Sequence, residues 1–578
     1  MRQANLARWR TVALGAVVLG SAAWAGEVSP TGGGHGPTVS DHLRQRAKQD
    51  PRATLDVIIR FRQQPGDAER NLLGSLGIHV RRQIRSSRWM AARLSGSAVA
   101  ALGANPAVDY VATDAPMSPN MDLARQAAQE PALGAPESTL KGAGVTIAML
   151  DSGVAQHPDL KSLVAVVDFT VSGSPKLGPS QSTSSTSYVP AYAPAASVDG
   201  YGHGTHVAGI MVGNGSTSAQ GGLAGIAPEA SLVSVRVLDD SGRGQASDVL
   251  AGLQWVLDNK DALGIRVLNL SLGHPVYEPA ERDPLVQQVE ALWSAGVVVV
   301  CSAGNAGRLG DGTITSPCNS RAVISVGALN DHNTPETTDD TAATYSSRGP
   351  TRGDLVAKPD LLAPGNRIVS TRAAGSYLDN LFPERRVAGD PAQPEVLEYL
   401  EMSGTSMAAP MVAGTVALML EQEPWLNPGT VKARLMLSAH KAELGNPFAS
   451  GAGALDILAA LRVRGDVADA PSPLVLPDSA AGQLGVENTA VLWGNPAFPL
   501  DAIWPMSVQW STASAAGDPL WWSPAVLWPN ADLWPEANLW PEADLWPETI
   551  LWGENVLWSD EPDTPMDIDP LAILVPDP

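Results

Sequence analysis

The sequence predicts an α/β domain built on a parallel sheet with helices on both faces. Two observations carry this prediction. Val145–Leu150 and Gly296–Val300 are nearly continuous apolar runs, which are typical of strands buried on both faces. Strand-like stretches also alternate with helix-like ones, as where Ala230–Leu238 is followed by a predicted helix over Ala246–Leu257. Such alternation favours a parallel sheet that helices cover on both sides.

Polar residues follow these two strands and begin two predicted helices. Asp151 follows the first strand, and Asn305 lies in the glycine loop after the second. His203 begins a small-residue helix after a glycine turn, and Ser406 begins an apolar helix that reaches Leu420. Open α/β sheets place their chemistry at the carboxyl ends of strands. Each residue alone also has an ordinary structural interpretation: a capping Asp or Ser, a packed His, or a turn Asn.

Together these four residues supply every part of a serine acyl-transfer site. Ser406 would be the nucleophile and His203 the general base, while Asp151 would orient the imidazole and stabilise its charged form. Asn305 would donate a hydrogen bond to the oxyanion alongside the backbone N–H of Ser406. The sequence therefore predicts a hydrolase that forms an acyl-enzyme.

Four motifs then carry a resemblance to a known family. They are Asp151-Ser152-Gly153, His203-Gly204-Thr205-His206, Ala303-Gly304-Asn305 and Gly404-Thr405-Ser406-Met407-Ala408. In the chain order Asp, His, Ser they resemble the signatures and the oxyanion loop of the subtilisin-like serine peptidases, the subtilases. Tyr345–Pro350, Lys358–Gly365 and the long insert before Met402 resemble the AprX-like branch most.

The resemblance implies a subtilisin-like fold over residues 125–463 and a serine endopeptidase that cuts polypeptides without a cofactor for its chemistry. It implies that the residues flanking the substrate are Gly242, Gly244, Ser271, Leu272, Gly273, Ser302 and Gly304. Thr315–Cys318 would form a wall of the pocket for the residue before the cut bond. In subtilases the residue matching Asp159 often helps to hold calcium, but the loop Gly213–Ser218 lacks a carboxylate. Calcium takes six to eight oxygen ligands, so structural calcium stays open.

The two cysteines of the chain are Cys301 and Cys318. In an exported protein they could form a disulfide, but sequence spacing does not reveal geometry. A disulfide and two buried thiols are therefore both kept as hypotheses. A metal site at the cysteines is disfavoured, because no histidine lies near them.

The segments before the catalytic domain predict a self-processed, exported precursor. Residues 1–25 have the arginines, apolar run and small residues of a signal peptide, with a retained membrane anchor as the alternative. Residues 26–50 are predicted as a linker. Residues 51–115 show the order βαββαβ of a ferredoxin-like unit, which resembles the inhibitory pro-domain of subtilases. The alternative is a free-standing small domain. The expected cleavage falls somewhere in Asp114–Gln129, and the product would be extracellular or periplasmic.

Residues 464–578 are predicted as an acidic tail of tryptophan repeats. From Gly465 the chain has 18 Asp or Glu and no Lys, Arg or His, so most of the net charge of −22 belongs to this tail. Tryptophans recur every six residues from Trp522 to Trp558, and Phe498 and Trp504 share that register. Because proline follows most of them, the tail is expected to dock on the catalytic domain or stay extended rather than fold by itself.

The tail leaves partners open. Its negative charge disfavours nucleic acid. It could bind an unknown partner or hold the protein at the cell surface, and a small solenoid is a further structural hypothesis. The alternative function is a catalytically silent subtilase-fold binding protein that acts through the tail.

Overall fold

The computed structural model describes residues 39–84, 87–114, 116–119, 136–170, 198–332, 337, 339–441, 446–478, 483–504 and 520–522. The predicted signal peptide, the Ser/Pro-rich insert at residues 172–197 and the repeats from Trp528 to Trp558 lie outside these residues. Among the helices that the structure describes, none is long and apolar enough to cross a bilayer.

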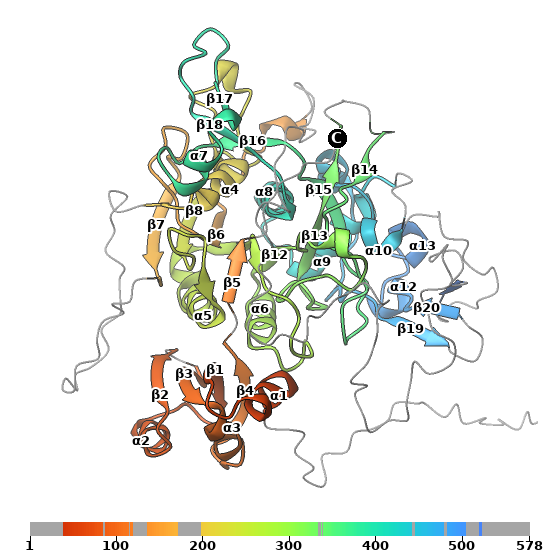
Figure 1. Cartoon of the computed structure of the whole chain (residues 1–578). Helices are drawn as coiled ribbons and strands as arrows, with labels where there is room; N and C mark the ends of the chain where they lie inside the picture. The colour runs from red at the N-terminus through yellow and green to blue at the C-terminus, as the bar shows by residue number, and fades with distance from the viewer. Residues whose placement is uncertain are drawn as a thin grey trace, which may run out of the picture. The chain divides into compact units, whose positions relative to one another are not determined.

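The N-terminal unit has a four-stranded antiparallel sheet in the order β2-β3-β1-β4 (Figure 1). Its elements are β1 (Thr54–Phe61), α2 (Asp67–Ser75), β2 (His79–Gln83), β3 (Trp89–Ser95), α3 (Gly96–Gly103) and β4 (Val108–Thr113). The chain order is therefore βαββαβ, as in ferredoxin-like folds. Val57, Ile59, Met90 and Leu102 fill the core of this unit.

Residues 41–49 correct the predicted linker, because they form helix α1 (Asp41–Gln49). The Ser40 side chain caps this helix by accepting a hydrogen bond from Leu43 N at 3.3 Å. Leu43 is only 1% exposed and belongs to the core of the N-terminal unit. The helix is polar except for Leu43 and Ala47, so its apolar pattern is too weak to recognise. Packing against α3 stabilises it instead.

The main sheet follows the order β14-β13-β12-β10-β6-β8-β7, with β15 beside β13. Its strands are β6 (Thr146–Asp151), β7 (Leu163–Asp168), β8 (Ser231–Arg236), β10 (Ile265–Leu270), β12 (Val298–Ser302), β13 (Ile324–Asn330), β14 (Thr341–Ala342) and β15 (Leu361–Pro364). All of these pairs are parallel except β13 with β14. Every residue of β6, β12, β13 and β15 is buried, which explains their apolar composition.

Helices cover both faces of this sheet, as the sequence predicted. The main ones are α4 (His203–Val212), α5 (Ala246–Leu263), α6 (Pro284–Ser294), α8 (Thr405–Gln422), α9 (Pro428–Ser438) and α11 (Ile457–Arg462). Gly252 of α5 lies against the Leu150 side chain, whereas Gly204 of α4 lies against Asp151 Cβ. Successive residues of a strand point to opposite faces, so α4 and α5 lie on opposite sides of β6.

Short elements complete the part of the chain that the structure describes. Three strands, β5 (Pro116–Pro119), β9 (Gly244–Gln245) and β11 (Leu272–Gly273), form one small sheet. The insert before Met402 forms another from β16 (Ile368–Thr371), β17 (Arg386–Val387) and β18 (Tyr399–Met402), next to α7 (Tyr377–Leu381). Single 3-10 turns span Pro136–Thr139, Ala219–Gly221, Gly307–Leu309 and Pro383–Arg385.

Beyond the domain boundary predicted near Val463, the chain packs on the catalytic domain. This segment contains β19 (Val475–Asp478), β20 (Gln483–Val486), α12 (Thr489–Leu492), α13 (Leu500–Ile503) and β21 (Leu520–Trp522), after α10 (Pro447–Ser450) of the domain itself. Trp493, Phe498 and Trp504 are buried in one cluster with Met436 and Phe448. Of the alternatives considered for the tail, residues 465–504 therefore adopt the one in which they dock on the catalytic domain. Large aromatic side chains gain most from such burial.

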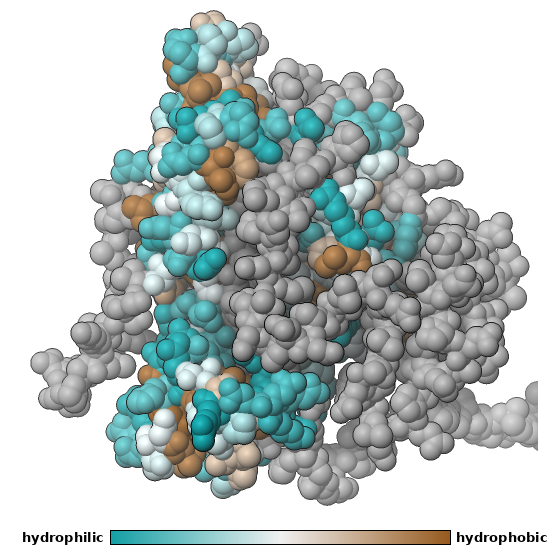
Figure 2. All heavy atoms as spheres, viewed as in Figure 1, coloured by the Kyte–Doolittle hydropathy of each residue, from teal (hydrophilic) through white to brown (hydrophobic). Residues whose placement is uncertain are grey.

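Surface hydropathy agrees with a core that lies inside these layers. In the view of Figure 2, the described surface is mainly hydrophilic, with apolar residues in separate patches. The apolar side chains of the main sheet, by contrast, are nearly all below 9% exposed. The polar residues buried among them are therefore the exceptions that need an explanation.

Candidate active site

Asp151 and His203 meet at the end of β6. Asp151 is the last residue of β6, and His203 is the first residue of α4. His203 Nδ1 lies 2.7 Å from Asp151 Oδ1, and both side chains are fully buried. The turn before the helix requires Gly202, whose φ is 101°. Since Nδ1 donates to the carboxylate, the lone pair of the neutral ring is on Nε2. His203 Nε2 has no hydrogen-bond partner among the described residues.

The second histidine of the motif has a structural role. His206 is fully buried, and its Nε2 lies 3.0 Å from Leu400 O and 3.2 Å from Ile368 O. Burial is the main cause that lowers the pKa of His206 to about 3. His206 is therefore neutral at physiological pH, and it adds no positive charge beside His203.

Ser406 is the second residue of α8, where Gly404 begins the helix with a φ of 148°. The Ser406 hydroxyl donates to Ser271 O at 3.2 Å, and the Ser271 hydroxyl donates to Ser406 O at 3.0 Å. These reciprocal bonds join the nucleophile candidate to the segment that leads into β11. A serine in the first turn also lies in the favourable field of the helix N-terminus.

Asn305 is fixed by the residue that precedes Ser406. Its Oδ1 accepts hydrogen bonds from Thr405 N and Thr405 Oγ1, both at 3.0 Å. These bonds place the amide nitrogen on the other side, where Asn305 Nδ2 is buried without a partner among the described residues. A buried N–H donor without an acceptor suits an oxyanion that forms only during a reaction.

A strand of the chain itself lies between two backbone edges near Ser271. β5 pairs antiparallel with β11, through Pro119 with Leu272 and Ser118 with Gly273. It also pairs antiparallel with β9, through Met117 with Gly244. An extended polypeptide therefore fits between β9 and β11, held by backbone hydrogen bonds on both sides.

Comparison with known proteins identifies the family. The profile of the subtilase family, Peptidase_S8, matches residues 142–453, which is more than half of the chain. This chain belongs to the subtilase family. Serine protease AprX of Bacillus subtilis (strain 168) is 40% identical over 342 residues, 58% of this chain and 70% of that protein. Subtilisin DY of Bacillus licheniformis is 33% identical over 322 residues, 55% of this chain and 92% of that protein.

A solved structure agrees on the fold. Fervidolysin from Fervidobacterium pennivorans, described as a keratinolytic enzyme related to subtilisin, aligns with a TM-score of 0.54 and 21% identity. The alignment covers 72% of this chain and 61% of that chain. This subtilase is thus a subtilisin-like serine peptidase, and enzymes of its family act on polypeptides.

The residues expected to flank the substrate fall into two groups in this subtilase. Gly244, Leu272 and Gly273 lie in the strands that pair with β5, and Ser271 precedes β11. The others are placed differently: Gly242 lies in a turn under the Tyr201 ring, Ser302 is the buried last residue of β12, and Gly304 donates to Thr405 Oγ1 at 3.2 Å. None of these three pairs with β5 in the described sheet.

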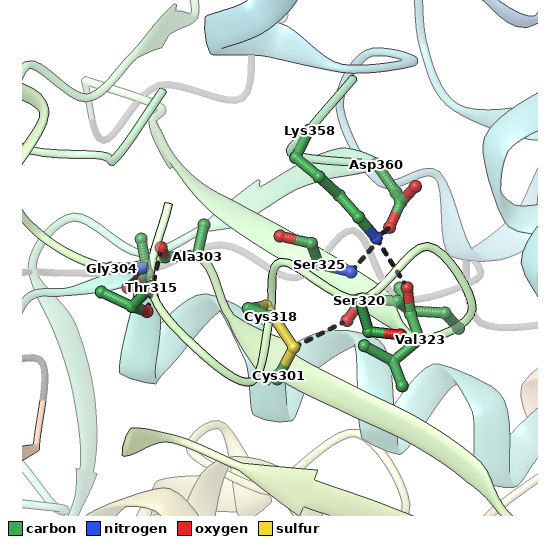
Figure 3. Close-up of a disulfide and its surroundings, with 12 residues drawn as sticks. Cys301, Ala303, Gly304, Thr315, Cys318, Ser320, Val323, Ser325, Lys358 and Asp360 are labelled. Atoms are coloured by element: carbon green, nitrogen blue, oxygen red, sulfur yellow. Dashed lines mark hydrogen bonds and ion pairs between the residues drawn. A yellow bond between two sulfur atoms is a disulfide. The ribbon is translucent and has the colours of Figure 1, made fainter. Parts of the chain in front are cut away.

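Cys301 and Cys318 form a disulfide, which decides between the two cysteine hypotheses (Figure 3). Both residues are at most 1% exposed, and their Cα atoms are 5.7 Å apart. The bond closes the loop that contains Asn305 and Thr315. Thr315 N donates to Ala303 O at 3.0 Å within this loop. Closing a loop of this length stabilises a fold by about 3 kcal/mol.

The residues around Asp159 do not fit a calcium ion. Asp159 Oδ1 accepts hydrogen bonds from Ser216 Oγ and from Thr217 N, both at 2.9 Å. Tyr399 OH, from the insert before Met402, donates to Asp159 Oδ2 at 2.5 Å. These partners direct protons at the carboxylate, whereas calcium needs oxygen lone pairs. Among the residues that the structure describes, no cluster of three His, Cys, Asp or Glu side chains could hold a metal.

The sequence analysis missed Asp199, a buried carboxylate four residues before His203. It accepts hydrogen bonds from Ser152 and Thr205, which belong to two of the signature motifs. A signal was available, since Asp199 precedes a predicted helix and Asp often caps helix starts. It was overlooked because a capping Asp is an ordinary structural feature.

Proposed function

We propose that Asp151, His203 and Ser406 are the catalytic triad of this peptidase and that they hydrolyse peptide bonds through an acyl-enzyme. The observation that carries this proposal is the 2.7 Å contact between His203 Nδ1 and Asp151, which leaves the His203 Nε2 lone pair available. Asn305 gives further support. Its Nδ2 has no hydrogen-bond partner among the described residues, and its Oδ1 accepts a hydrogen bond from Thr405, the residue before Ser406.

The reaction follows from these positions. On substrate binding the Ser406 hydroxyl exchanges Ser271 O for His203 Nε2, which takes its proton as Oγ bonds to the carbonyl carbon. Asn305 Nδ2 and the Ser406 N–H stabilise the oxyanion. The imidazolium, held by Asp151, then gives the proton to the leaving amine as the peptide bond breaks. Water repeats the two proton transfers and releases the carboxylic acid product.

The proposed substrate is an extended polypeptide that lies between β9 and β11. Backbone pairing of this kind binds many sequences, so it gives affinity with little side-chain preference. Gly244, Leu272 and Gly273 supply this pairing, and β5 shows the geometry that a substrate would copy.

We further propose that residues 51–115 are an inhibitory pro-domain. Support comes from β5, which follows this unit directly and lies where the substrate would bind. Further contacts are Arg82 Nη2 with Asp248 Oδ1 at 2.7 Å and Tyr110 OH with Glu278 Oε2 at 2.8 Å. A pro-domain that occupies the cleft inhibits the enzyme until it is cut away. Processing would fall on the C-terminal side of Pro119, and residues 1–25 would direct export to the periplasm or the outside of the cell.

The intact mass of the exported protein tests both proposals, with Ser406→Ala beside the wild type. Wild type is expected to lose every residue up to at least Pro119, whereas Ser406→Ala keeps the N-terminal unit. If both proteins keep it, self-processing is refuted, and a catalytically silent scaffold becomes the better hypothesis. The same spectra show whether the tryptophan repeats survive maturation.

A further inference from the structure

Asp199 is a buried carboxylate that receives four hydrogen bonds. The residue is 5% exposed. Its Oδ1 accepts from Ser152 Oγ at 2.8 Å and from Gly202 N at 2.7 Å. Its Oδ2 accepts from Thr205 N at 2.8 Å and from Thr205 Oγ1 at 2.6 Å. A carboxylate can accept all four bonds, whereas an amide has only one acceptor oxygen.

The two hydroxyl partners are held so that their protons point at Asp199. Ser152 Oγ accepts a hydrogen bond from Gly204 N at 2.9 Å, and Thr205 Oγ1 accepts one from Ala155 N at 2.8 Å. Each hydroxyl therefore uses a lone pair elsewhere. Thr205 Oγ1 donates its proton to Asp199, and Ser152 Oγ has Asp199 Oδ1 at 2.8 Å as its nearer acceptor and Asp151 Oδ1 at 3.3 Å as a longer one. Burial raises the pKa of Asp199, while these donors lower it. Burial is the larger of the two effects, so the pKa of Asp199 lies above its ordinary value.

This network joins the strand that carries Asp151 to the helix that carries His203. Ser152 N donates to Asp151 Oδ1 at 2.7 Å, the same oxygen that faces His203 Nδ1. Ser152 Oγ and Asp199 also bind the N–H groups of Gly204 and Thr205, the second and third residues of α4. No side chain of the preceding residue caps this helix. Asp199 and Ser152 therefore supply its N-terminal cap from a distance.

The first turn of α4 lies very close to the loop after β6, so its position relative to that loop must be held closely. A Cβ at Gly204 would collide with the Gly153 carbonyl oxygen, and it would also touch Asp151 Cβ. Only glycine allows such an approach. A small rotation of this turn would therefore move the His203 ring relative to Asp151.

We propose that Asp199 is a positioning residue of this peptidase, which fixes Ser152 and the first turn of α4 so that His203 Nδ1 meets Asp151. The proposal rests on the proposed function, since it takes Asp151 and His203 as members of the triad. Asp199 acts through its neighbours. Within the described residues its hydrogen bonds reach Ser152, Gly202 and Thr205, and none reaches Asp151 or His203.

The direct test is Asp199→Asn, with kcat and KM measured on an extended peptide and normalised to titrated Ser406. The amide NH₂ would face either Ser152 and Gly202 or Thr205, which are all donors, so the turn must shift. A displacement of about 1 Å in a catalytic group lowers kcat by roughly 10²-fold. KM is expected to stay the same, because Asp199 contacts neither β9 nor β11. An unchanged kcat overturns the proposal.

A double-mutant cycle with Ser152→Ala tests the route of the effect. If Asp199 acts through Ser152, the double variant is no slower than the slower single variant. If the two substitutions lower kcat by factors that multiply in the double variant, the proposed route is overturned. If Asp199→Asn does not fold, Ser152→Ala decides alone: its kcat must fall at constant KM, and an unchanged kcat rejects the proposal.

Two controls separate this proposal from loss of stability and from failure of the triad. Asp456→Ala removes the side chain that caps α11 through Ala459 N at 2.8 Å, and it should lower the melting temperature without lowering kcat. Ser406→Ala must be inactive. If Ser406→Ala keeps its activity, the proposed function fails; if it is inactive but Asp199→Asn is as fast as wild type, only the positioning role fails.

Discussion

At the scale of single residues, the candidate site is marked by polar atoms that the fold leaves unsatisfied. Asp151 Oδ2, His203 Nε2 and Asn305 Nδ2 are buried without hydrogen-bond partners among the described residues. A buried polar atom of this kind costs about 1–3 kcal/mol. Two of these three atoms are the ones that the proposed reaction would use. The cost is therefore understood as preorganisation of the site before the substrate arrives.

Asp311 is an unsatisfied group outside that reaction, and it predicts a pH effect on stability. Its Oδ1 is buried without a partner among the described residues, and burial raises its pKa to about 6. The unfolded value is about 3.9. Between these two values the folded state holds a proton that the unfolded state has lost, so stability falls as pH rises from 4 to 6. At pH 7 the full cost is present.

The substitution Asp311→Asn is therefore expected to raise the free energy of unfolding by about 2 kcal/mol at pH 7 and by nothing at pH 4. Denaturant unfolding of this variant in the Ser406→Ala background avoids self-digestion. An equal gain at both pH values would show that the charge of Asp311 is not the cause.

At the scale of elements, the insert before Met402 holds Asp159 and the loop after α4. Tyr399 of β18 donates to Asp159, and Thr217 Oγ1 donates to Tyr399 OH at 2.8 Å. Ala219 N also donates to Gly389 O at 2.9 Å, which ties the same loop to the insert. For Asp159 the family resemblance left structural calcium open. Here the loop after α4 is held by side-chain and backbone hydrogen bonds.

This arrangement predicts that calcium does not stabilise the protein through Asp159. The melting temperature of the Ser406→Ala protein should be the same in EDTA as in millimolar calcium. Tyr399→Phe should lower stability by about 2 kcal/mol in both buffers, since a hydrogen bond to a charged group is lost. A calcium-dependent rise in the melting temperature that disappears in Asp159→Asn would contradict this prediction.

At the scale of the whole molecule, the catalytic domain includes chain that the sequence placed in a tail. Ser472 Oγ donates to Asp360 Oδ1 at 2.6 Å and accepts from Lys432 Nζ at 2.7 Å. Asp360 also pairs with Lys358 at 2.7 Å, and all four side chains are fully buried (Figure 3 shows Lys358 and Asp360). Removing one partner from a buried charged network destabilises it strongly.

Truncation separates the docked segment from the repeats that follow it. A chain that ends at Trp522 keeps β21 paired with β20, and it is expected to keep the stability and activity of the full protein. A chain that ends at Val463 loses Ser472 and the buried Trp493, Phe498 and Trp504, which should cost more than about 5 kcal/mol. The melting temperature and the activity after export are measured for each of the two truncated proteins. Equal stability of the two truncated proteins would show that residues 464–504 are dispensable.

The sequence by itself determined the fold class and named the four residues of the proposed reaction. Buried parallel strands need continuous apolar runs, and chemistry at their ends needs particular residue types, so both leave local patterns. The contact between Asp151 and His203 agrees with that prediction, while their catalytic roles stay predictions that mutation must test.

Only the tertiary structure decided the disulfide, the position of α1, the contact of Tyr399 with Asp159 and the docking of residues 465–504. Each depends on atoms that are far apart in the chain: Cys301 with Cys318, and Tyr399 with Asp159, 240 positions away. Asp199 is a subtler case, because its sequence position suggests only a helix cap. Its link to Asp151 passes through Ser152, and that link exists only once β6 and α4 are packed together.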